Sequence, residues 1–395
     1  MEQRMNILAP AFRADPYSHY VEMRRHSPVC QVDPGGIWAV SRYADVVSIL
    51  RSPERFSSAG FKAAWQPPWV GHNPLANSIL AMDAPAHTRL RGLLTRAFGA
   101  SAIAGIEPRA RALCDRLVER LEGDAEFIAA LAAPLPAFVI SELLGLDHAL
   151  EAHYKRWIDD LVSVTPEPQS PEHEARVRAT IGEIDRAMID VIEARRRAPS
   201  NDLVSELGRA DAGGQPLSER ETIDLLVTVL GGGIETTTAF LGNMLLLLAE
   251  RPDELARLRA SPELVPRFIE EMLRYDGPSQ SVPRLTTSDV ELSGVTIPQG
   301  SLVLALVGSA VRDEQHYPDP DRFDIERGQA SLTFGHGVHF CLGAALARME
   351  AKIALEALLP RIRGLELACA RRDIEYNRTL TVRGPVALPL RFTLA

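Results

Sequence analysis

The segment from Leu225 to Ala249 constrains the fold more than any other part of the sequence. It is almost entirely apolar, and as a helix it is long enough to cross about 30 Å of hydrocarbon. Glu235 lies near its centre, close to Gly231 and Gly233. A carboxylate at that depth in lipid costs about 2–3 kcal/mol or more. We therefore expect a long helix buried inside a protein, no membrane span, and a cytoplasmic location.

The composition fits a protein large enough to bury such a helix. The chain has 395 residues, of which 46% are hydrophobic, and its formal net charge is −9. This balance is typical of a globular protein and gives no sign of nucleic-acid binding. Four cysteines lie far apart, at Cys30, Cys114, Cys341 and Cys369, which disfavours a disulfide framework. No long linker divides the sequence, so we expect residues 1–395 to form a single domain.

Helical periodicity dominates the sequence. Apolar residues recur at three- and four-residue intervals in Ile106–Leu121, Ala175–Arg197, Asp253–Arg259 and Val265–Tyr275. Strand patterns cluster in Val29–Val40, Arg284–Val307 and Thr379–Thr393, and the first and last of these indicate hairpins. Ser57–Met82 has no clear period, which is typical of a binding loop or lid. We expect a mainly α protein with a small β-rich flank, an α+β fold.

The segment with the clearest chemistry is the stretch FGHGVHFCLG at residues 334–343. Its glycines let the backbone turn tightly and approach a flat ligand. A helical pattern begins just after Cys341, and a helix N-terminus favours a thiolate over a thiol. A thiolate in a glycine-rich turn with aromatic neighbours suits the axial ligand of a haem iron. A zinc site of His336, His339 and Cys341 is the alternative, and it would need a fourth ligand or an open position.

This segment resembles the cysteine loop of the cytochrome P450 family, in its soluble bacterial type. The family pattern Phe-x-x-Gly-x-His/Arg-x-Cys-x-Gly is matched by Phe334, Gly337, His339, Cys341 and Gly343. The resemblance implies the P450 fold, in which haem lies between the central oxygen-activation helix and the helix after the cysteine loop. It also implies haem b with Cys341 as its iron ligand, and a monooxygenase that inserts one atom of O2 into an apolar small molecule.

The apolar helix carries a second motif. The stretch GGIET at residues 232–236 resembles the family's oxygen-activation motif, Ala/Gly-Gly-x-Asp/Glu-Thr. Glycines let a ligand lie against the helix, and a mid-helix threonine can open the hydrogen-bond ladder locally. The resemblance implies two catalytic residues. Thr236 would donate a hydrogen bond to dioxygen, and Glu235 would relay protons.

A third motif predicts an internal ion-pair network. Glu271 and Arg274 match the family's Glu-x-x-Arg pattern. Residues three apart share one helix face, so a carboxylate and a guanidinium at this spacing can pair in a bidentate manner. Arg322 resembles the third member of the family's network. We expect these three residues to stabilise the fold and to take no part in the chemistry.

Haem propionates need positive or hydrogen-bonding partners, because a buried carboxylate without them is costly. The resemblance assigns this role to His87, Arg91, Arg284 and His339. His87 and Arg91 are four residues apart and share one helical face. With the cysteine loop included, the expected cofactor-binding residues are His87, Arg91, Arg284, Phe334, Gly335, His339, Cys341 and Gly343.

The resemblance also implies external partners. Electrons derived from NAD(P)H are expected to arrive through a ferredoxin and its ferredoxin reductase, and O2 is the second substrate. We expect docking on the cysteine-loop side, where Arg348 and Arg96 supply positive charge. Neither nucleic acid nor membrane is an expected partner, and we expect a monomer.

The expected substrate pocket is mainly apolar. By resemblance its residues are Trp65, Leu75, Leu161, Val229, Gly232, Gly233, Val282 and Leu380, with His72, Ser279, Gln280 and Ser281 as polar anchors. Such walls suit hydroxylation or epoxidation of a terpenoid, steroid, fatty acid or polyketide, in secondary metabolism or detoxification. The alternatives left open are a haem-thiolate peroxygenase or isomerase and a non-catalytic haem-binding sensor.

Overall fold

The computed structural model describes residues 4–165, 167–209 and 216–395, which fall into two compact units. Unit 1 comprises Met1–Phe56, Arg109–Leu135 and Thr236–Ala395, and unit 2 comprises Ser57–Pro108 and Pro136–Glu235. The chain passes between the units within β3 (Phe56–Ser57), α6 (Ala100–Val118), α7 (Pro134–Leu144) and α11 (Glu219–Glu250). The expectation of a single domain over residues 1–395 stays a prediction.

Unit 1 combines helices from both ends of the chain. They are α1 (Pro10–Ala14), α2 (Pro16–His26), α3 (Tyr43–Arg51), α12 (Pro252–Ala260), α13 (Val265–Asp276), α14 (Val307–Ala310) and α15 (Ala344–Leu358). The start of α2 shows how the sequence sets these boundaries. The Asp15 carboxylate accepts hydrogen bonds from the backbone N–H groups of Tyr17 and Ser18, and Pro16 occupies the first helical position.

The largest sheet of unit 1 has five strands in the order β1-β2-β8-β5-β3. These are β1 (Val29–Val32), β2 (Ile37–Val40), β8 (Leu302–Ala305), β5 (Val282–Thr286) and β3 (Phe56–Ser57). Val29 lies opposite Val40, so the predicted hairpin at the N-terminal end is confirmed. Apolar side chains of α3 and α14 pack with those of the strands in one buried cluster that includes Ile49, Val303 and Val307.

The second sheet of unit 1 corrects the prediction for the end of the chain. Its order is β4-β10-β9, with β4 (Gly123–Glu126), β10 (Pro389–Leu394) and β9 (Ile362–Leu367). The predicted hairpin over residues 379–393 is wrong, because only its second half is a strand, and that strand pairs with β4 and β9. Residues 381–383 instead bond to residues 278–281, and residues 384–385 pair with residues 376–377. A separate two-stranded sheet pairs β6 (Val290–Leu292) with β7 (Val295–Ile297).

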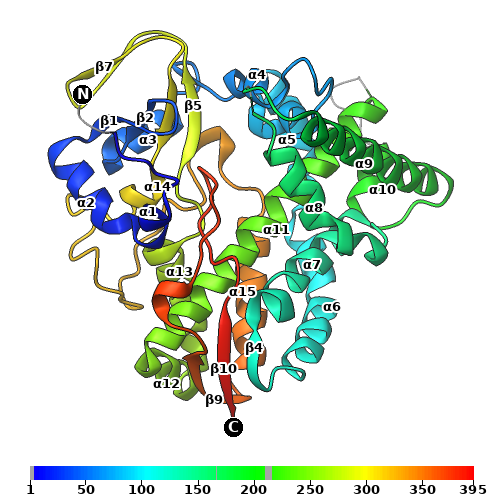
Figure 1. The fold of residues 1–395 in the computed structure, drawn as a ribbon. Helices are drawn as coiled ribbons and strands as arrows, with labels where there is room; N and C mark the ends of the chain where they lie inside the picture. Colours follow the sequence, from blue (N-terminus) through cyan, green and yellow to red (C-terminus); the bar gives the residue numbers. More distant parts are fainter. Residues whose placement is uncertain (1–3, 166, 210–215) are drawn as a thin grey trace. The chain divides into compact units, whose positions relative to one another are not determined.

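Unit 2 is helical. Its helices are α4 (Lys62–Trp65), α5 (Ala86–Ala97), α8 (Glu151–Val162), α9 (Pro171–Arg197) and α10 (Leu203–Arg209). α9 packs against both α8 and α10 (Figure 1). The aperiodic segment Ser57–Met82 contains short helical turns, including Leu75–Asn77 and Ile79–Ala81. The expectation of a mainly helical protein with small sheets is confirmed.

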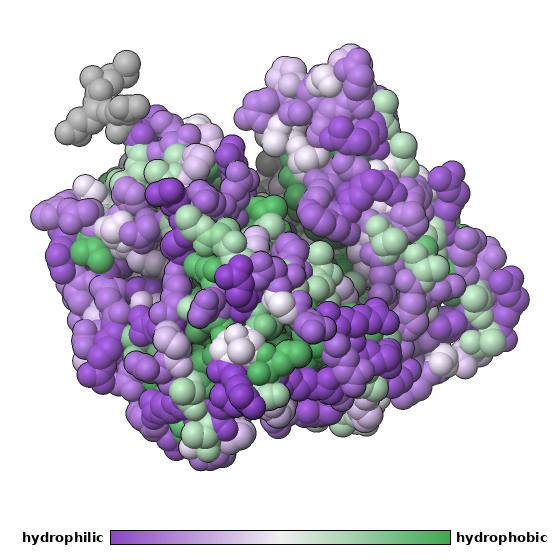
Figure 2. Space-filling view, turned by 60° about the horizontal axis from the view of Figure 1, so that its bottom comes forward, coloured by the Kyte–Doolittle hydropathy of each residue, from purple (hydrophilic) through white to green (hydrophobic). Residues whose placement is uncertain are grey.

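The apolar segment at Leu225–Ala249 lies within α11, as predicted. By length and composition alone α11 is long enough and apolar enough to cross a membrane, but 61% of its most apolar window is buried inside the protein. Core helices of soluble proteins pass the same test. The face of the molecule in Figure 2 is mainly hydrophilic, and hydrophobic residues are interspersed among the hydrophilic ones. These observations agree with a core helix.

Candidate functional site

The cysteine loop of unit 1 is built on two glycines with positive φ. Gly335 has φ of +76° and Gly337 has φ of +72°, a conformation that other residues rarely adopt. At Gly337 a Cβ would also lie 2.7 Å from the carbonyl oxygen of Leu50. The backbone N–H of Cys341 donates to the carbonyl of Phe334 over 2.9 Å and closes the turn. The loop therefore requires glycine where the motif has it.

The turn presents Cys341 at the surface of unit 1, immediately before α15. Cys341 is exposed, and the N-cap of α15 is Gly343. Unpaired N–H groups and the helix dipole at such a position favour a thiolate. A Cβ at Gly343 would lie 3.9 Å from Sγ of Cys341, so glycine keeps the space beside the sulfur clear of side chains. The sulfur is thus accessible to an external ligand.

The surroundings of this thiol fit a flat apolar group. Val338 and Phe340, in the same loop, are 50% and 44% exposed. The Phe334 and Phe340 rings lie 6.5 Å apart. Apolar side chains of this size are usually covered in a folded protein, so their exposure beside a thiol fits a haem face. In the parts of the chain that the structure describes, no three His, Cys, Asp or Glu side chains form a metal site, which gives the zinc alternative no support.

α11 has an uncovered stretch at its centre, at the oxygen-activation motif. Residues 222–230 and 239–248 are buried, whereas residues 231–236 are half-buried or exposed. A Cβ at Gly232 would meet no atom of the described residues within 4 Å, whereas one at Gly233 would clash with Cδ1 of Ile140. Gly233 therefore serves packing, and Gly232 faces open space. Glu235 and Thr236 lie in this uncovered stretch.

The residues predicted to bind propionates lie on three elements. In unit 2, His87 and Arg91 lie on α5, with His87 only 2% exposed and Arg91 half-buried. In unit 1, Arg284 lies on β5, where its side chain is buried and its Nη1 donates to the carbonyl of Pro283 over 2.8 Å. His339 is half-buried in the cysteine loop. Their roles toward haem stay predictions.

The predicted Glu271–Arg274 pair is present on α13. Arg274 donates from Nη2 to Oε1 of Glu271 over 2.7 Å and from Nε to Oε2 over 2.9 Å. The Arg274 side chain is 0% exposed, and its Nη1 also donates to the carbonyls of Val311 and Pro320. A buried bidentate pair with further acceptors compensates the desolvation of both charges. Arg274 thereby ties α13 to the segment before the cysteine loop.

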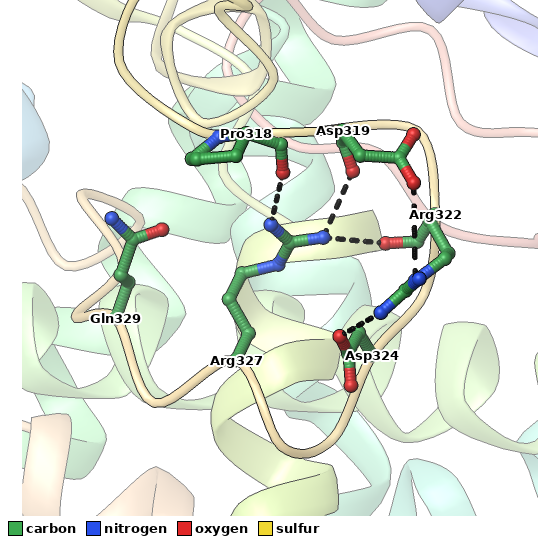
Figure 3. Close-up of a pocket in the computed structure, with 6 residues that line it drawn as sticks. All are labelled: Pro318, Asp319, Arg322, Asp324, Arg327 and Gln329. Carbon is green, nitrogen blue, oxygen red and sulfur yellow. Dashed lines mark hydrogen bonds and ion pairs between the residues drawn. The ribbon is translucent and has the colours of Figure 1, made fainter.

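The third member of this network is Arg327, which corrects the prediction for Arg322. Arg327 Nε lies 3.3 Å from Oε1 of Glu271, and its side chain is 8% exposed. The Arg322 side chain is 65% exposed and pairs with Asp324. Arg322 joins the network through its carbonyl, which accepts from Arg327 Nη2 over 2.9 Å (Figure 3).

Figure 3 shows why Arg327 takes this place. Its guanidinium points into the loop and donates to the carbonyls of Pro318 and Asp319, beside a cavity of about 410 Å³. The signal in the sequence was weak, because Arg322 and Arg327 stand in equally polar surroundings within one loop. Only the path of residues 318–327 decides which guanidinium reaches Glu271.

Three of the predicted polar anchors have partners inside the protein. Ser281 Oγ donates to the carbonyl of Leu380 over 2.7 Å. Gln280 is buried and accepts from the hydroxyl of Tyr20 over 3.1 Å. In unit 2, His72 Nε2 lies 2.8 Å from Oδ1 of Asp224. These side chains therefore hold the protein's own segments together.

The apolar residues of the expected substrate pocket lie in both units. Unit 2 contains Trp65, Leu75, Leu161, Val229, Gly232 and Gly233, and unit 1 contains Val282 and Leu380. In unit 2, a Cβ at Gly231 would lie 3.2 Å from Cδ1 of Ile158 and 3.5 Å from Cδ2 of Leu75. α8 and the segment at Leu75 thus come together on α11 one residue before the oxygen-activation motif. That these residues contact a substrate stays a prediction.

Of the two arginines expected to dock a partner, Arg348 is held in place. Its Nη2 donates to Oε2 of Glu270 over 3.0 Å, and its guanidinium carbon lies 4.5 Å from the centroid of the Phe334 ring. It therefore supports the cysteine loop and carries a compensated charge. Arg96, near the end of α5, is exposed.

Comparison with known proteins agrees with this geometry. The family model for cytochrome P450 matches residues 152–366. Cytochrome P450 monooxygenase PikC of Streptomyces venezuelae is 36% identical over 398 residues, covering 98% of this chain and 94% of the relative. Mycinamicin IV hydroxylase/epoxidase of Micromonospora griseorubida is 37% identical over 380 residues, with 94% of each chain covered. The solved structure of cytochrome P450 CYP109Q5 from Chondromyces apiculatus shares 38% identity and a TM-score of 0.90, and the match covers 100% of both chains. Sequence and fold agree over nearly the full length, and the chain belongs to the cytochrome P450 family.

Proposed function

We propose that this chain is a haem-thiolate monooxygenase in which Cys341 is the axial ligand of haem b. The observation that carries the proposal is the exposed thiol of Cys341, held beside α15 by a turn that requires glycine. The enzyme inserts one oxygen atom from O2 into an apolar small molecule. Relatives with this activity include PikC, a monooxygenase by name, and a hydroxylase/epoxidase.

The first task of the chain is to hold the sulfur of Cys341 as a thiolate, the form that binds haem iron. When bound, haem supplies dioxygen activation, and a thiolate ligand favours O–O cleavage. The free N–H groups at the start of α15 stabilise negative charge on Sγ of Cys341. The closed turn, with its N–H···O bond from Cys341 to Phe334, fixes the direction of the sulfur. Glycine at position 343 leaves room beside it.

Proton delivery is assigned to Glu235 and Thr236. Both lie in the uncovered stretch of α11, where water can reach them although the rest of the helix is buried. The Thr236 hydroxyl would donate a hydrogen bond to dioxygen. The Glu235 carboxylate takes up protons from solvent and passes them on, a role that contributes about 10²–10⁴-fold to rate in general acid–base catalysis.

His87, Arg91, Arg284 and His339 are proposed to compensate the two propionates. Arg284 supports this role because its guanidinium is buried and carries a fixed positive charge. His87 supports it because it is almost fully buried on the same helical face as Arg91.

Electrons come from external redox partners, which we propose to be a ferredoxin and its reductase, acting on a monomeric cytoplasmic enzyme. The substrate is a terpenoid, steroid, fatty acid or polyketide of secondary metabolism. The apolar wall that Leu75 and Ile158 form beside Gly231 supports an apolar substrate. The name mycinamicin IV hydroxylase/epoxidase supports hydroxylation or epoxidation as the reaction.

The first test is the absorption spectrum of the reduced protein under carbon monoxide. We expect a strongly red-shifted Soret band that is lost in Cys341→Ala, while Cys369→Ala, which changes a half-buried cysteine, keeps it. A haem band without the red shift would contradict the role of Cys341. Absence of any haem band in haem-supplemented protein would contradict the cofactor.

A second measurement separates the monooxygenase from a peroxygenase and from a sensor. Product formed from O2 only when NAD(P)H, a ferredoxin and its reductase are present identifies the monooxygenase. Product formed with hydrogen peroxide alone, at the same rate, would identify a peroxygenase. Ligand binding without product from any apolar compound that changes the haem spectrum would favour a sensor.

A further inference from the structure

A short segment of unit 1 carries part of the expected substrate wall. We call residues 376–385 the C-terminal loop. Leu380 and Thr381, at its tip, are half-buried, whereas residues 382–385 are buried. Leu380 packs against a buried N-terminal cluster that includes Phe12 and Tyr20. The tip is therefore in contact with the first helices of the chain.

The C-terminal loop is bonded to the segment that precedes β5. Gln280 N–H donates to the carbonyl of Thr381 over 2.7 Å, and Arg383 N–H donates to the carbonyl of Pro278 over 2.7 Å. Ser279 pairs with Val382 as an antiparallel bridge. Two segments that are about a hundred residues apart in sequence thus form one two-stranded wall.

Arg383 anchors this wall to the N-terminal helices. It is 2% exposed. Its Nε donates to the carbonyl of Arg13 over 2.8 Å and its Nη2 donates to the carbonyl of Ala14 over 3.0 Å. Its Nη1 donates to Oδ1 of Asp276 over 2.7 Å, which compensates the buried charge. One side chain of the loop therefore bonds to both α1 and the end of α13.

Arg13 makes the reciprocal contact. It lies on α1, is 3% exposed, and donates from Nε to the carbonyl of Asn377 over 2.9 Å and from Nη2 to the carbonyl of Val382. The Tyr17 hydroxyl on α2 donates to the same Asp276 oxygen over 2.6 Å. Arg13 thus bonds to the backbone of the C-terminal loop, and Arg383 bonds to the backbone of α1. Because both side chains are buried, the loop has little freedom to shift against α1 and α2.

α11 holds the loop from the other side. Asn243 Nδ2 donates to the carbonyls of Asp276 and Arg383 over 3.0 and 3.1 Å. Any side chain at Gly384 would clash with Ala239, so the loop backbone lies directly on the helix. Asn243 is seven residues after Thr236 and lies on the same helical face. The loop position is thereby fixed relative to the end of α11 that follows the oxygen-activation motif.

We propose that Arg13, Tyr17, Asn243 and Arg383 are positioning residues that set the place of Leu380 and Thr381 and so determine which large ligands fit. The inference rests on the proposed function, because it takes these two residues as substrate wall. None of the four is assigned contact with substrate or haem. Each acts through the backbone of the C-terminal loop.

The test compares Tyr17→Phe and Asn243→Leu with Tyr317→Phe, all as haem-loaded full chains. Tyr317→Phe is the matched control, because Tyr317 is 0% exposed and donates to the carbonyl of Ala330 over 3.0 Å, away from the C-terminal loop. Two azoles that bind haem iron are titrated by their Soret shift. Imidazole is too small to reach the wall, and clotrimazole carries three phenyl-type rings that must pack against it.

We expect Tyr17→Phe and Asn243→Leu to raise the dissociation constant of clotrimazole at least fivefold and to change that of imidazole less than twofold. Tyr317→Phe should change neither. Equal changes for both azoles, or an unchanged clotrimazole constant in both variants, would overturn the inference. If imidazole gives no Soret shift in the unsubstituted protein, the proposed function itself fails.

A second measurement requires no haem. Amide hydrogen exchange over residues 377–385 should accelerate at least tenfold in Tyr17→Phe and Asn243→Leu relative to Tyr317→Phe. Equal exchange of this segment in all three variants would show that the N-terminal helices and α11 do not hold the loop, and would overturn the inference independently of the azole result.

Discussion

Arg322 and Arg327 stand five residues apart in one loop, but they differ in burial. Arg327 is 8% exposed and bonds to Glu271 and to carbonyls of its own loop, whereas Arg322 is 65% exposed and pairs with Asp324 and Asp319. Removing one partner of a buried network leaves an uncompensated charge and unsatisfied acceptors. Exposed pairs contribute little, because solvent screens them.

This difference gives a paired prediction. Arg327→Gln should lower the free energy of unfolding by about 3–5 kcal/mol, since Glu271 then loses one of its two guanidinium partners in the interior. Arg322→Gln, which leaves the network carbonyl in place, should leave the melting temperature nearly unchanged. Thermal unfolding of the two purified variants checks this. Equal destabilisation by both substitutions would contradict the assignment of Arg327, and not Arg322, as the third member of the network.

Glu350 on α15 is a buried carboxyl group outside the proposed mechanism. It is 1% exposed, its Oε2 has no hydrogen-bond partner among the described residues, and burial raises the pKa of Glu350 well above its usual value. The unfolded chain ionises this group near pH 4.3, whereas the folded chain keeps it protonated. Above that pH the unfolded state binds fewer protons, so stability falls as pH rises until the folded pKa is passed.

The Glu350→Gln variant should therefore gain stability relative to the unsubstituted protein as pH rises. The expected slope is about 1.4 kcal/mol per pH unit between the two pKa values of Glu350. Unfolding by urea at pH 5, 6, 7 and 8 measures it. Glu356→Gln is the control on the same helix, because Glu356 is 33% exposed and paired with Arg111 over 2.7 Å. Parallel curves for Glu350→Gln and the unsubstituted protein would contradict the prediction.

At the scale of residues, the spacing of residues in the sequence predicted the contacts that lie within a single helix or turn. Glu271 and Arg274 lie one turn apart on one helix, so their pairing follows from helix geometry. The exposed Cys341 follows from a glycine turn before a helix. Arg327 could not be identified in this way, because its partner lies more than fifty residues away and is reached only through the path of an irregular loop.

At the scale of elements, the predicted C-terminal hairpin also shows that the sequence pattern does not identify a partner that is distant in sequence. Residues 379–385 alternate in polarity as a strand does, and residues 383–385 resemble a turn. Residues 381–383 bond to the segment 278–281 through the N–H groups of Gln280 and Arg383, and residues 384–385 pair with residues 376–377. A strand pattern predicts that a segment pairs, and tertiary contacts decide with which other segment.

α11 gives a prediction at the scale of one helix. Gly232→Ala should raise the stability of the haem-free protein by about 1 kcal/mol, because alanine is the better helix former and its Cβ meets no described atom within 4 Å. Gly233→Ala should destabilise by about 1–3 kcal/mol, because Ile140 must move. Thermal unfolding of both variants compares them, and equal effects would contradict the assignment of the two faces.

The variants Gly232→Ala and Gly233→Ala also test whether the uncovered stretch of α11 is a ligand site. A methyl group at position 232 occupies space that the proposed function gives to dioxygen, so the reduced haem protein should bind carbon monoxide at least fivefold more weakly in Gly232→Ala. The Gly233→Ala variant, which faces Ile140, should bind it with nearly unchanged affinity once folded. Unchanged affinity in Gly232→Ala would place the gas ligand elsewhere.

At the scale of the whole molecule, charge limits how a ferredoxin can dock. The chain has a formal net charge of −9, and an acidic ferredoxin would be repelled by most of such a surface. Association then depends on local positive charge that is not compensated by a neighbour. Arg348 is bonded to Glu270, so it contributes less to docking than its sequence position suggests. Arg96 is exposed and is the better candidate of the two.

Reversal of this charge should therefore slow electron transfer in a salt-dependent way. We expect Arg96→Glu to lower the rate of haem reduction by a ferredoxin several-fold at low ionic strength. The difference should shrink near 0.5 M salt, where the Debye length falls below about 5 Å. Arg186→Glu, the same charge change at an exposed position of α9, controls for net charge. Stopped-flow absorbance at the Soret band measures both rates. Equal slowing by the two variants would mean that total charge governs association, and an unchanged rate in Arg96→Glu would exclude Arg96 from the docking surface.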